Sequence, residues 1–182
     1  MNEPAFVEMT EEAYLSWESQ QIERSELHHG FAVSFAGGTY KHDQIAQNVR
    51  DVLRANFRSP CSVCTSDLKV RIEKTTYFYP DAGVICESVD DEAAYVERPC
   101  ILVEVLSRRT RSYDLIEKRA AYRTLASLDA YVIVHTTERY VEVDVRRSTD
   151  GWTTMRFREG EPVFLGDVTI PMNDIYRSHL QP

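Results

Sequence analysis

The chain has 182 residues, of which 43% are hydrophobic and 27% charged, a length and composition typical of one soluble domain spanning residues 1–182. No apolar run approaches the ~20 residues of a membrane-spanning helix, and residues 1–10 lack the features of a signal peptide, so we expect a cytoplasmic protein with no membrane partner. The net charge of −8 counts against a protein that coats DNA, unless its basic residues gather in one place.

The N-terminal half of the chain predicts two helices and several strands. Thr10 followed by two acidic residues is typical of a helix start, and this helix is expected to end near Gln20. Apolar residues at helical spacing predict a second, amphipathic helix over residues 41–57. Turn residues and extended apolar segments predict strands over residues 23–28, 31–36, 61–66, 68–73, 76–79 and 83–87.

The C-terminal half predicts a buried unit followed by a hairpin. Residues 100–106 (CILVEVL) and 130–135 (AYVIVH) are nearly continuous in apolar residues, as in strands buried on both faces. With a predicted helix over residues 113–126 they form a right-handed βαβ unit. Residues 139–147 alternate valines with polar residues, which predicts a strand with one face in water, paired with residues 152–158. The order of elements predicts an α/β (α+β) fold, in which helices flank a mixed central sheet.

The four cysteines are interpreted as thiols, because disulfides are rare in a reducing compartment. Cys61 and Cys64 have the CxxC spacing that can begin a zinc site. No second compact pair of ligands accompanies them, so we expect no zinc there. Cys86 and Cys100 lie in apolar segments and are interpreted as small buried hydrophobic residues.

A glutamate inside an apolar strand is the main sign of a functional site. Glu104 would lose its charge or cost several kcal/mol if buried alone, so a basic side chain or a metal ion is expected to compensate it. Asp81 follows Pro80 at the end of an aromatic strand. If that strand lies beside the strand of Glu104, the two carboxylates can hold a cation such as Mg²⁺ between them. The alternative role for Asp81 is a turn or cap after the proline.

Lys118 is the candidate basic residue of the site, and it lies on the predicted helix that follows the Glu104 strand. Beside a bound metal, its ammonium can face a phosphate or an attacking water. The alternative is an i,i+4 ion pair with Asp114, worth about 0.3–0.5 kcal/mol. Basic residues gather around it and form either a phosphate-contact patch or a solvated helix face: Arg108, Arg109, Arg111, Lys118, Arg119 and Arg123.

These residues resemble the Uma-type family of restriction endonucleases, which belongs to the PD-(D/E)XK restriction-endonuclease-like superfamily. The resemblance rests on Pro80-Asp81, residues 104–107 (EVLS), Thr110, Asp114, Lys118 and Tyr122. Outer segments with weaker similarity are Glu26-Leu27 with Gly30, His42 with Asn48, residues 67–71 and residues 131–134. The similarity extends over roughly residues 10–145.

The resemblance implies a metal-dependent DNA endonuclease, a type of enzyme that often works as a homodimer. Asp81 and Glu104 would hold Mg²⁺ or Mn²⁺, and Lys118 would orient the attacking water or neutralise charge on the phosphate. Glu26 is either a further ligand or a solvated strand residue. His42 has two possible roles. In the first it contacts the substrate or helps as a base, and in the second it is simply a polar residue at the start of a helix. The proposed phosphate contacts are Arg108, Arg109 and Arg111.

The sequence departs from the superfamily at one position. The usual lysine stands two residues after the glutamate, where this chain has Leu106. This leaves open a catalytically silent module that binds nucleic acid or a protein partner. It also leaves open a structural oligomerisation domain in which Glu104 and Lys118 form a buried ion pair.

Overall fold

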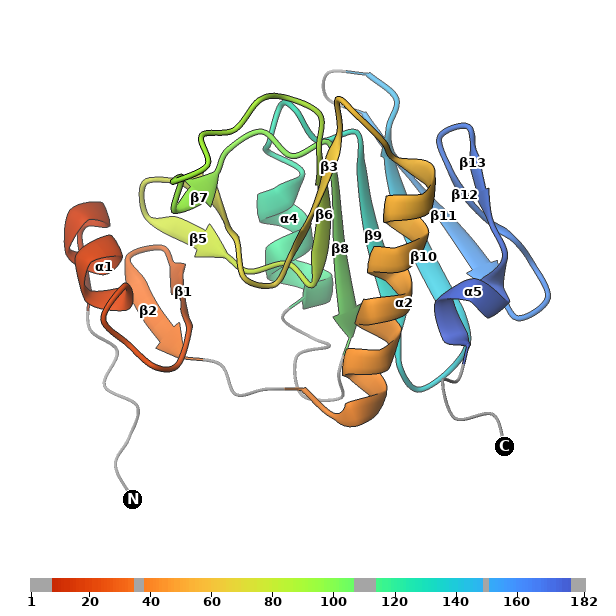
Figure 1. Cartoon of the computed structure of the whole chain (residues 1–182), viewed down its shortest axis with the longest axis horizontal. Coiled ribbons are helices and arrows are strands. Elements are labelled where there is room, and N and C mark those ends of the chain that lie inside the picture. The colour runs from red at the N-terminus through yellow and green to blue at the C-terminus, as the bar shows by residue number, and fades with distance from the viewer. Residues whose placement is uncertain (1–7, 35–37, 107–113, 149–150, 178–182) are drawn as a thin grey trace.

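Two β-sheets meet in the computed structural model, which describes residues 8–34, 38–106, 114–148 and 151–177 (Figure 1). The larger sheet has six strands, in the spatial order β11 (Trp152–Arg158), β10 (Tyr140–Arg146), β9 (Ala130–His135), β8 (Ile101–Leu106), β6 (Ala82–Ile85) and β3 (Ser62–Thr65). Strands β8 and β9 are parallel, as expected for a βαβ unit, and the other neighbours are antiparallel.

The smaller sheet has five strands, in the order β2 (Phe31–Ser34), β1 (Ser25–His28), β5 (Thr76–Phe78), β4 (Lys69–Glu73) and β7 (Tyr95–Val96). His29 and Gly30 connect β1 to β2 with φ values of 49° and 89°, the positive values that a tight hairpin turn requires. Helix α1 (Glu11–Glu18) begins at Thr10, whose side chain accepts a hydrogen bond from Ala13 N–H. It packs on this sheet through Tyr14.

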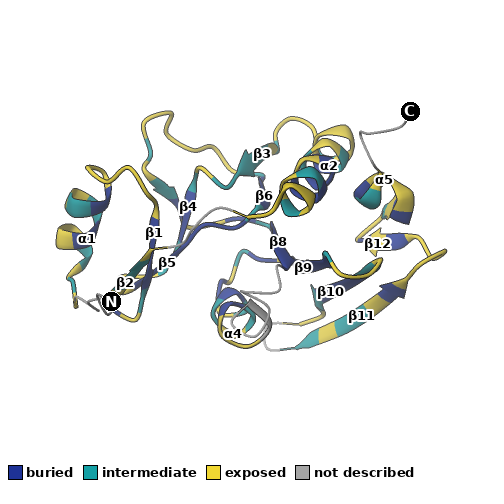
Figure 2. Cartoon of the chain, turned by 90° about the horizontal axis from the view of Figure 1, so that it is seen from below, coloured by how far each residue is buried: buried dark blue, intermediate teal, exposed yellow. Residues whose placement is uncertain are grey.

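Helices cover both faces of the six-stranded sheet (Figure 2). Helix α2 (Tyr40–Asn56) and the short α5 (Met172–Tyr176) lie on one face, where apolar residues of α2 pack against valines of the sheet. The π-helical turn η1 (Asp114–Lys118) and α4 (Arg119–Tyr122) lie on the other face. The hairpin β12 (Val163–Leu165) and β13 (Val168–Ile170) lies beside α5. No helix in the described ranges is long and apolar enough to cross a membrane.

Helix α2 is tied to the end of the described chain through a buried amide. The Asn48 side chain is fully buried and its Nδ2 donates hydrogen bonds to the backbone carbonyls of Ile175 and Arg177, at 3.0 and 2.9 Å. The Arg177 guanidinium donates in return to Asn48 Oδ1. The middle of α2 is therefore joined to a segment almost 130 residues later in the sequence.

The predicted fold class is confirmed, but three details differ. The strands belong to separate sheets and not to one central sheet. Strands β7, β12 and β13 and helix α5 were not predicted, because they are too short to show a periodic pattern. The expected wet face of β10 is wrong: Glu142 and Asp144 are 7% and 1% exposed, because arginine side chains cover them.

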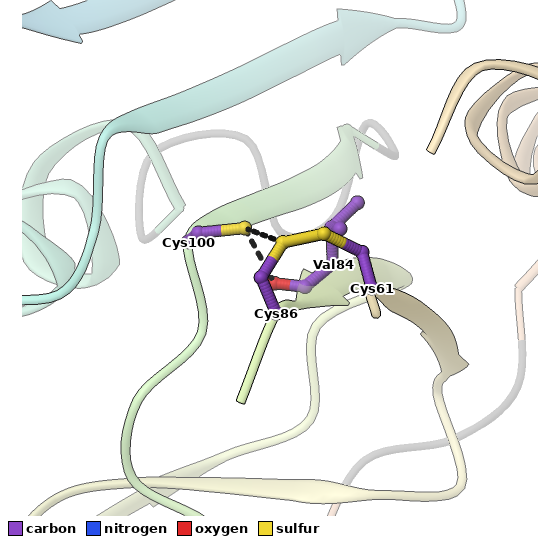
Figure 3. The surroundings of a disulfide bond; sticks show 4 residues. All are labelled: Cys61, Val84, Cys86 and Cys100. Carbon is purple, nitrogen blue, oxygen red and sulfur yellow. Dashed lines mark hydrogen bonds between the residues drawn. A yellow bond between two sulfur atoms is a disulfide. The ribbon is translucent and has the colours of Figure 1, made fainter. Parts of the chain in front are cut away.

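The prediction that all four cysteines are thiols is also wrong. Cys61 and Cys86 form a disulfide, while Cys64 and Cys100 are free (Figure 3). The cause lies in the pairing of β3 with β6, because Ser62 is opposite Ile85 and the next residues outward are Cys61 and Cys86. The half-buried Cys86 is therefore not simply a small hydrophobic residue.

A candidate active site where the two sheets meet

A three-residue link carries the chain from the small sheet into the large one. Strand β5 ends at Phe78 and β6 begins at Ala82, so Asp81 is the last residue of the link. Because Ala82 pairs with Val103 in antiparallel register, the continued register places Asp81 opposite Glu104. The Val105 N–H donates to Asp81 Oδ2 at 2.7 Å. The predicted adjacency of the Asp81 and Glu104 strands is confirmed.

Lys118 joins the two sheets through its ammonium group. Its Nζ lies 2.8 Å from Oε1 of Glu26 on β1 and 3.0 Å from Oε1 of Glu104 on β8. The Tyr122 hydroxyl donates to the same Glu104 oxygen at 2.9 Å. The side chains of Glu26, Glu104 and Lys118 are all less than one-tenth exposed. A basic side chain and a phenol therefore compensate the Glu104 carboxylate.

Glu26 is a buried member of this site and not a solvated strand residue. The Tyr79 N–H donates to its Oε1 at 2.9 Å, and His28 Nε2 lies 3.1 Å from its Oε2. Burial raises the pKa of Glu26, but the charge of Lys118 and the hydrogen bonds from His28, Lys118 and Tyr79 outweigh it, so the pKa lies below its ordinary value. Glu26 is therefore ionised at neutral pH and holds Lys118 in place.

His42 lies against Asp81 from the first turn of α2. The Thr39 side chain accepts a hydrogen bond from the His42 N–H, and His42 Nε2 is 3.3 Å from Asp81 Oδ2. The hydrogen bond to Asp81 raises the pKa of His42 and outweighs the opposing effect of burial. The Asp81 side chain is 16% exposed, so this carboxylate is more open to solvent than Glu26 or Glu104.

Other predicted site residues lie elsewhere or cannot be placed. Arg108, Arg109 and Arg111 lie outside the described residues, and so does the Asp114 side chain with its predicted Lys118 pair. Leu106 is buried in the apolar cluster beneath α4. Within the described ranges, no three His, Cys, Asp or Glu side chains form a group that could hold a metal ion. The site therefore offers carboxylates from neighbouring strands and not a complete preformed set of ligands.

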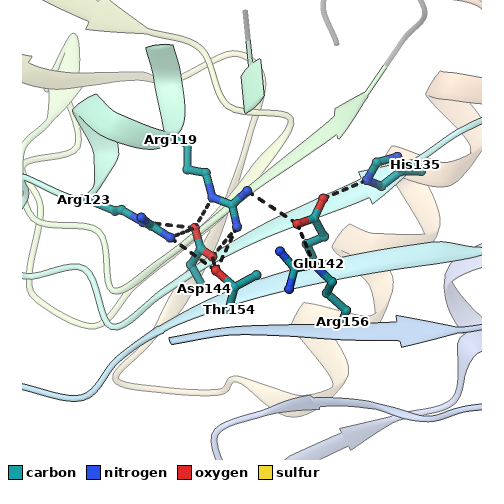
Figure 4. Close-up of polar contacts among 7 residues, drawn as sticks. All are labelled: Arg119, Arg123, His135, Glu142, Asp144, Thr154 and Arg156. Carbon is teal, nitrogen blue, oxygen red and sulfur yellow. Dashed lines mark hydrogen bonds and ion pairs between the residues drawn. The ribbon is translucent and has the colours of Figure 1, made fainter. Parts of the chain in front are cut away.

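A second charged cluster, absent from the sequence predictions, lies on the same face of the large sheet (Figure 4). Arg119 forms a bidentate ion pair with Asp144, and Arg123 and Thr154 contact the same carboxylate, at 2.8 and 2.6 Å. Burial raises the pKa of Asp144, but hydrogen bonds from Arg119 and Thr154 and the two arginine charges outweigh it and lower the pKa.

Glu142 completes this second cluster, in contact with three basic side chains. Its carboxylate lies 3.3 Å from His135 Nε2, 3.5 Å from Arg119 and 3.7 Å from Arg156. His135 is thus a buried histidine at the end of β9 with a carboxylate partner. One available signal was the i,i+4 spacing of Arg119 and Arg123, which places two guanidiniums on one helix face.

A family model described as "Uma2: Putative restriction endonuclease" matches residues 11–174. The chain belongs to the Uma2 family. The resemblance inferred from the sequence is thus confirmed, and it extends nearly to the end of the described chain. Among similar proteins, "Uncharacterized protein slr1290" from Synechocystis sp. is 30% identical over 94% of this chain and 93% of its own. Another Synechocystis protein, sll1609, is 30% identical over 76% of this chain and 84% of its own.

A crystal structure titled as a "putative nuclease belonging to DUF820" from Anabaena variabilis shares the fold of this Uma2 chain. The TM-score is 0.75, with 15% sequence identity, and the alignment covers 92% of this chain and 97% of the Anabaena chain. The similarity therefore extends over both sheets and over the junction that holds Asp81, Glu104 and Lys118.

Proposed function

We propose that this Uma2 protein is a metal-dependent DNA endonuclease, active as a homodimer, that hydrolyses phosphodiester bonds where the two sheets meet. The observation that carries the proposal is the opposed placement of Asp81 and Glu104, with the Lys118 ammonium bound to Glu104. A pair of acids beside a buried lysine suits a reaction in which negative charge builds on a phosphate. The family description supports nuclease chemistry in general.

The carboxylates fit one Mg²⁺ or Mn²⁺ ion that keeps several waters. Magnesium in proteins is usually bound by one or two carboxylates together with water and substrate oxygens. Asp81 is partly exposed, and its described contacts from Val105 N–H and His42 both use Oδ2. Glu104 would supply the second carboxylate from β8. A bound ion would lower the pKa of a water and stabilise the leaving oxygen.

The surrounding side chains then have separate roles. Lys118 places a buried ammonium at the site, where it can neutralise charge that develops on the phosphate. Glu26 and Tyr122 orient the reacting groups, because they bind Lys118 and Glu104 respectively. His42 can hold or move a proton at Nε2 beside Asp81. Arg108, Arg109 and Arg111 remain the proposed phosphate contacts.

Cleavage assays with single-stranded, duplex and branched DNA test this proposal. We expect cleavage that requires Mg²⁺ or Mn²⁺ and is lost in Asp81→Ala and Glu104→Ala. Lys118→Ala should still bind metal in calorimetric titrations but cut more slowly, and Lys118→Arg need not rescue it, because a planar guanidinium does not reproduce a compact ammonium. Glu159→Ala is the control, since its side chain is 73% exposed and pairs only with surface Arg139 among the described residues.

A catalytically silent module that binds nucleic acid or a protein partner is the second candidate. Two observations favour it: buried Leu106 occupies the position of the superfamily lysine, and the Lys118 ammonium pairs with the Glu104 carboxylate. Protein that binds metal yet cuts no DNA would establish this candidate in place of the enzyme. Protein that binds no divalent ion would instead support a structural role for the Glu104–Lys118 pair.

A further inference from the structure

Three cysteines from separate segments gather at one end of the large sheet. Cys61 precedes β3, Cys86 follows β6 and Cys100 precedes β8. The Cys61–Cys86 disulfide lies beside the Cys100 thiol, whose Sγ is 3.3 Å from Cys86 Sγ. In Figure 3 the sulfur atom of Cys86 lies between those of Cys61 and Cys100.

This order of sulfur atoms is the one that thiol–disulfide exchange requires, because the entering thiolate attacks one sulfur while the other leaves. We propose that Cys61, Cys86 and Cys100 form a thiol–disulfide exchange site, in which Cys86 is bonded to either Cys61 or Cys100. A bond forms between Cys100 Sγ and Cys86 Sγ as the Cys61–Cys86 bond breaks. The bonding pair leaves on Cys61 Sγ, which receives the proton that Cys100 gives up. No outside oxidant or reductant is consumed.

The backbone holds Cys100 in position for this step. Its N–H donates to the Val84 carbonyl at 2.8 Å, and its thiol contacts the same oxygen at 3.3 Å. Val84 pairs with Ile101, so β6 and β8 are already hydrogen-bonded neighbours at this end. The exchange moves the covalent link from the β3–β6 pair to the β6–β8 pair, and both pairs exist before the bond changes.

The environment of Cys100 sets the rate of the exchange. The attacking species is the thiolate. Burial, together with the charge of Asp129, raises the pKa of the Cys100 thiol above its ordinary value. The exchange is therefore slow at neutral pH and accelerates as the pH rises. Cys64 is a free cysteine on β3, and burial raises its pKa to about 11.

Peptide mapping after alkylation tests the site without reference to nuclease activity. A Cys64→Ser background is used, because Cys61 and Cys64 lie in one peptide after digestion with trypsin and a glutamate-specific protease. The second protease cuts after Glu97 and separates Cys86 from Cys100, since trypsin does not cut between Arg98 and Pro99. The folded protein is oxidised with glutathione disulfide and then treated with N-ethylmaleimide for increasing times.

We expect two populations, one with labelled Cys100 and a Cys61–Cys86 bond, and one with labelled Cys61 and a Cys86–Cys100 bond. The second population should form several-fold faster at about pH 8.5 than at about pH 7, as the thiolate fraction rises. Cys61→Ser in this background should form the Cys86–Cys100 bond, and Cys100→Ser should keep Cys61–Cys86 alone. Circular dichroism confirms that each variant is folded.

Either of two results would overturn the proposal. One is complete labelling of Cys100 with no label on Cys61 at either pH. The other is folded Cys61→Ser protein in which Cys86 and Cys100 both stay free under the oxidant. The trapping experiment on the Cys64→Ser protein decides the matter even if Cys61→Ser does not fold.

Discussion

Two buried charged clusters lie on the same face of the large sheet, and two consecutive residues of the chain supply a basic side chain to each. Lys118, at the end of η1, points to Glu26 and Glu104, whereas Arg119, at the start of α4, points to Glu142 and Asp144. Glu104 and Glu142 both pair with Ile133, so they belong to one row of residues across the sheet. The clusters nevertheless differ in their balance of charge.

Among the described residues, the Lys118 ammonium pairs with two carboxylates, those of Glu26 and Glu104, while Asp81, opposite Glu104, pairs with His42. The Arg119 cluster sets two carboxylates against three guanidiniums, of which that of Arg119 makes a bidentate contact with Asp144. The second cluster is therefore complete as a structural element. The first keeps an excess of negative charge beside a partly exposed acid, which suits a site for a cation.

Lys118→Met is expected to have the largest effect on stability. The change removes the ammonium but keeps an unbranched side chain, so Glu26 and Glu104 stay buried without their shared partner. We expect the free energy of unfolding at neutral pH to fall by about 3–5 kcal/mol, as when a buried ion pair loses one member. Urea denaturation followed by circular dichroism measures this change, with Glu159→Gln as an exposed control.

The pH dependence of this variant provides a sharper test. In the wild type the folded-state pKa of Glu26 is lowered, so its contribution to stability is present above about pH 4.3 and is lost as the pH falls through the folded pKa. Without the ammonium, burial raises the pKa of the same carboxyl. Lys118→Met should therefore gain stability as the pH falls from about 7 to about 5. A loss of stability over that range would contradict the coupling of Lys118 to Glu26.

Asp144→Asn should cost about 2–3 kcal/mol, because Arg119 and Arg123 lose the charge that they share. The lowered pKa of Asp144 means that its contribution is present above about pH 3.9 and disappears in acid, so variant and wild type should converge there. DNA cleavage by the folded fraction should not change. Loss of cleavage in fully folded Asp144→Asn would show that the two clusters act as one unit.

Tyr122→Phe should have the smallest effect, about 1.5 kcal/mol, because Lys118 still contacts the Glu104 oxygen that loses the phenol. Burial, followed by the charges of Glu104 and Glu26, raises the pKa of Tyr122 far above its ordinary value, so the hydroxyl remains a donor at all working pH values. A double-mutant cycle with Lys118→Met measures the coupling of the two donors. Strictly additive losses would mean that they act independently on Glu104.

The central part of the candidate site was predictable from the sequence. Glu104 interrupts an apolar strand, and the free energy of burying a charge requires a partner nearby. The βαβ pattern then placed Lys118 on the helix above that strand. The role of Glu26 was not predictable, because it depends on how the small sheet meets the large one.

The second cluster and the disulfide needed the structure. Glu142 and Asp144 alternate with valines, and this pattern is the same for a strand facing water and for one covered by arginines. The Cys61–Cys86 bond depends on the register of β3 against β6, across 25 residues of sequence. Apart from the i,i+4 spacing of Arg119 and Arg123, local sequence patterns give no sign of either contact, since distant segments decide both.

The buried Asn48 amide has a consequence for the order of events during synthesis. A ribosome completes α2 early, but the carbonyls that accept the Asn48 hydrogen bonds belong to Ile175 and Arg177. Until those residues emerge, the amide must stay bonded to water, because a buried amide without partners costs about 1–3 kcal/mol. The nascent chain therefore cannot bury this side of the large sheet before Ile175 and Arg177 are made, although Asp81, Glu104 and Lys118 emerge much earlier.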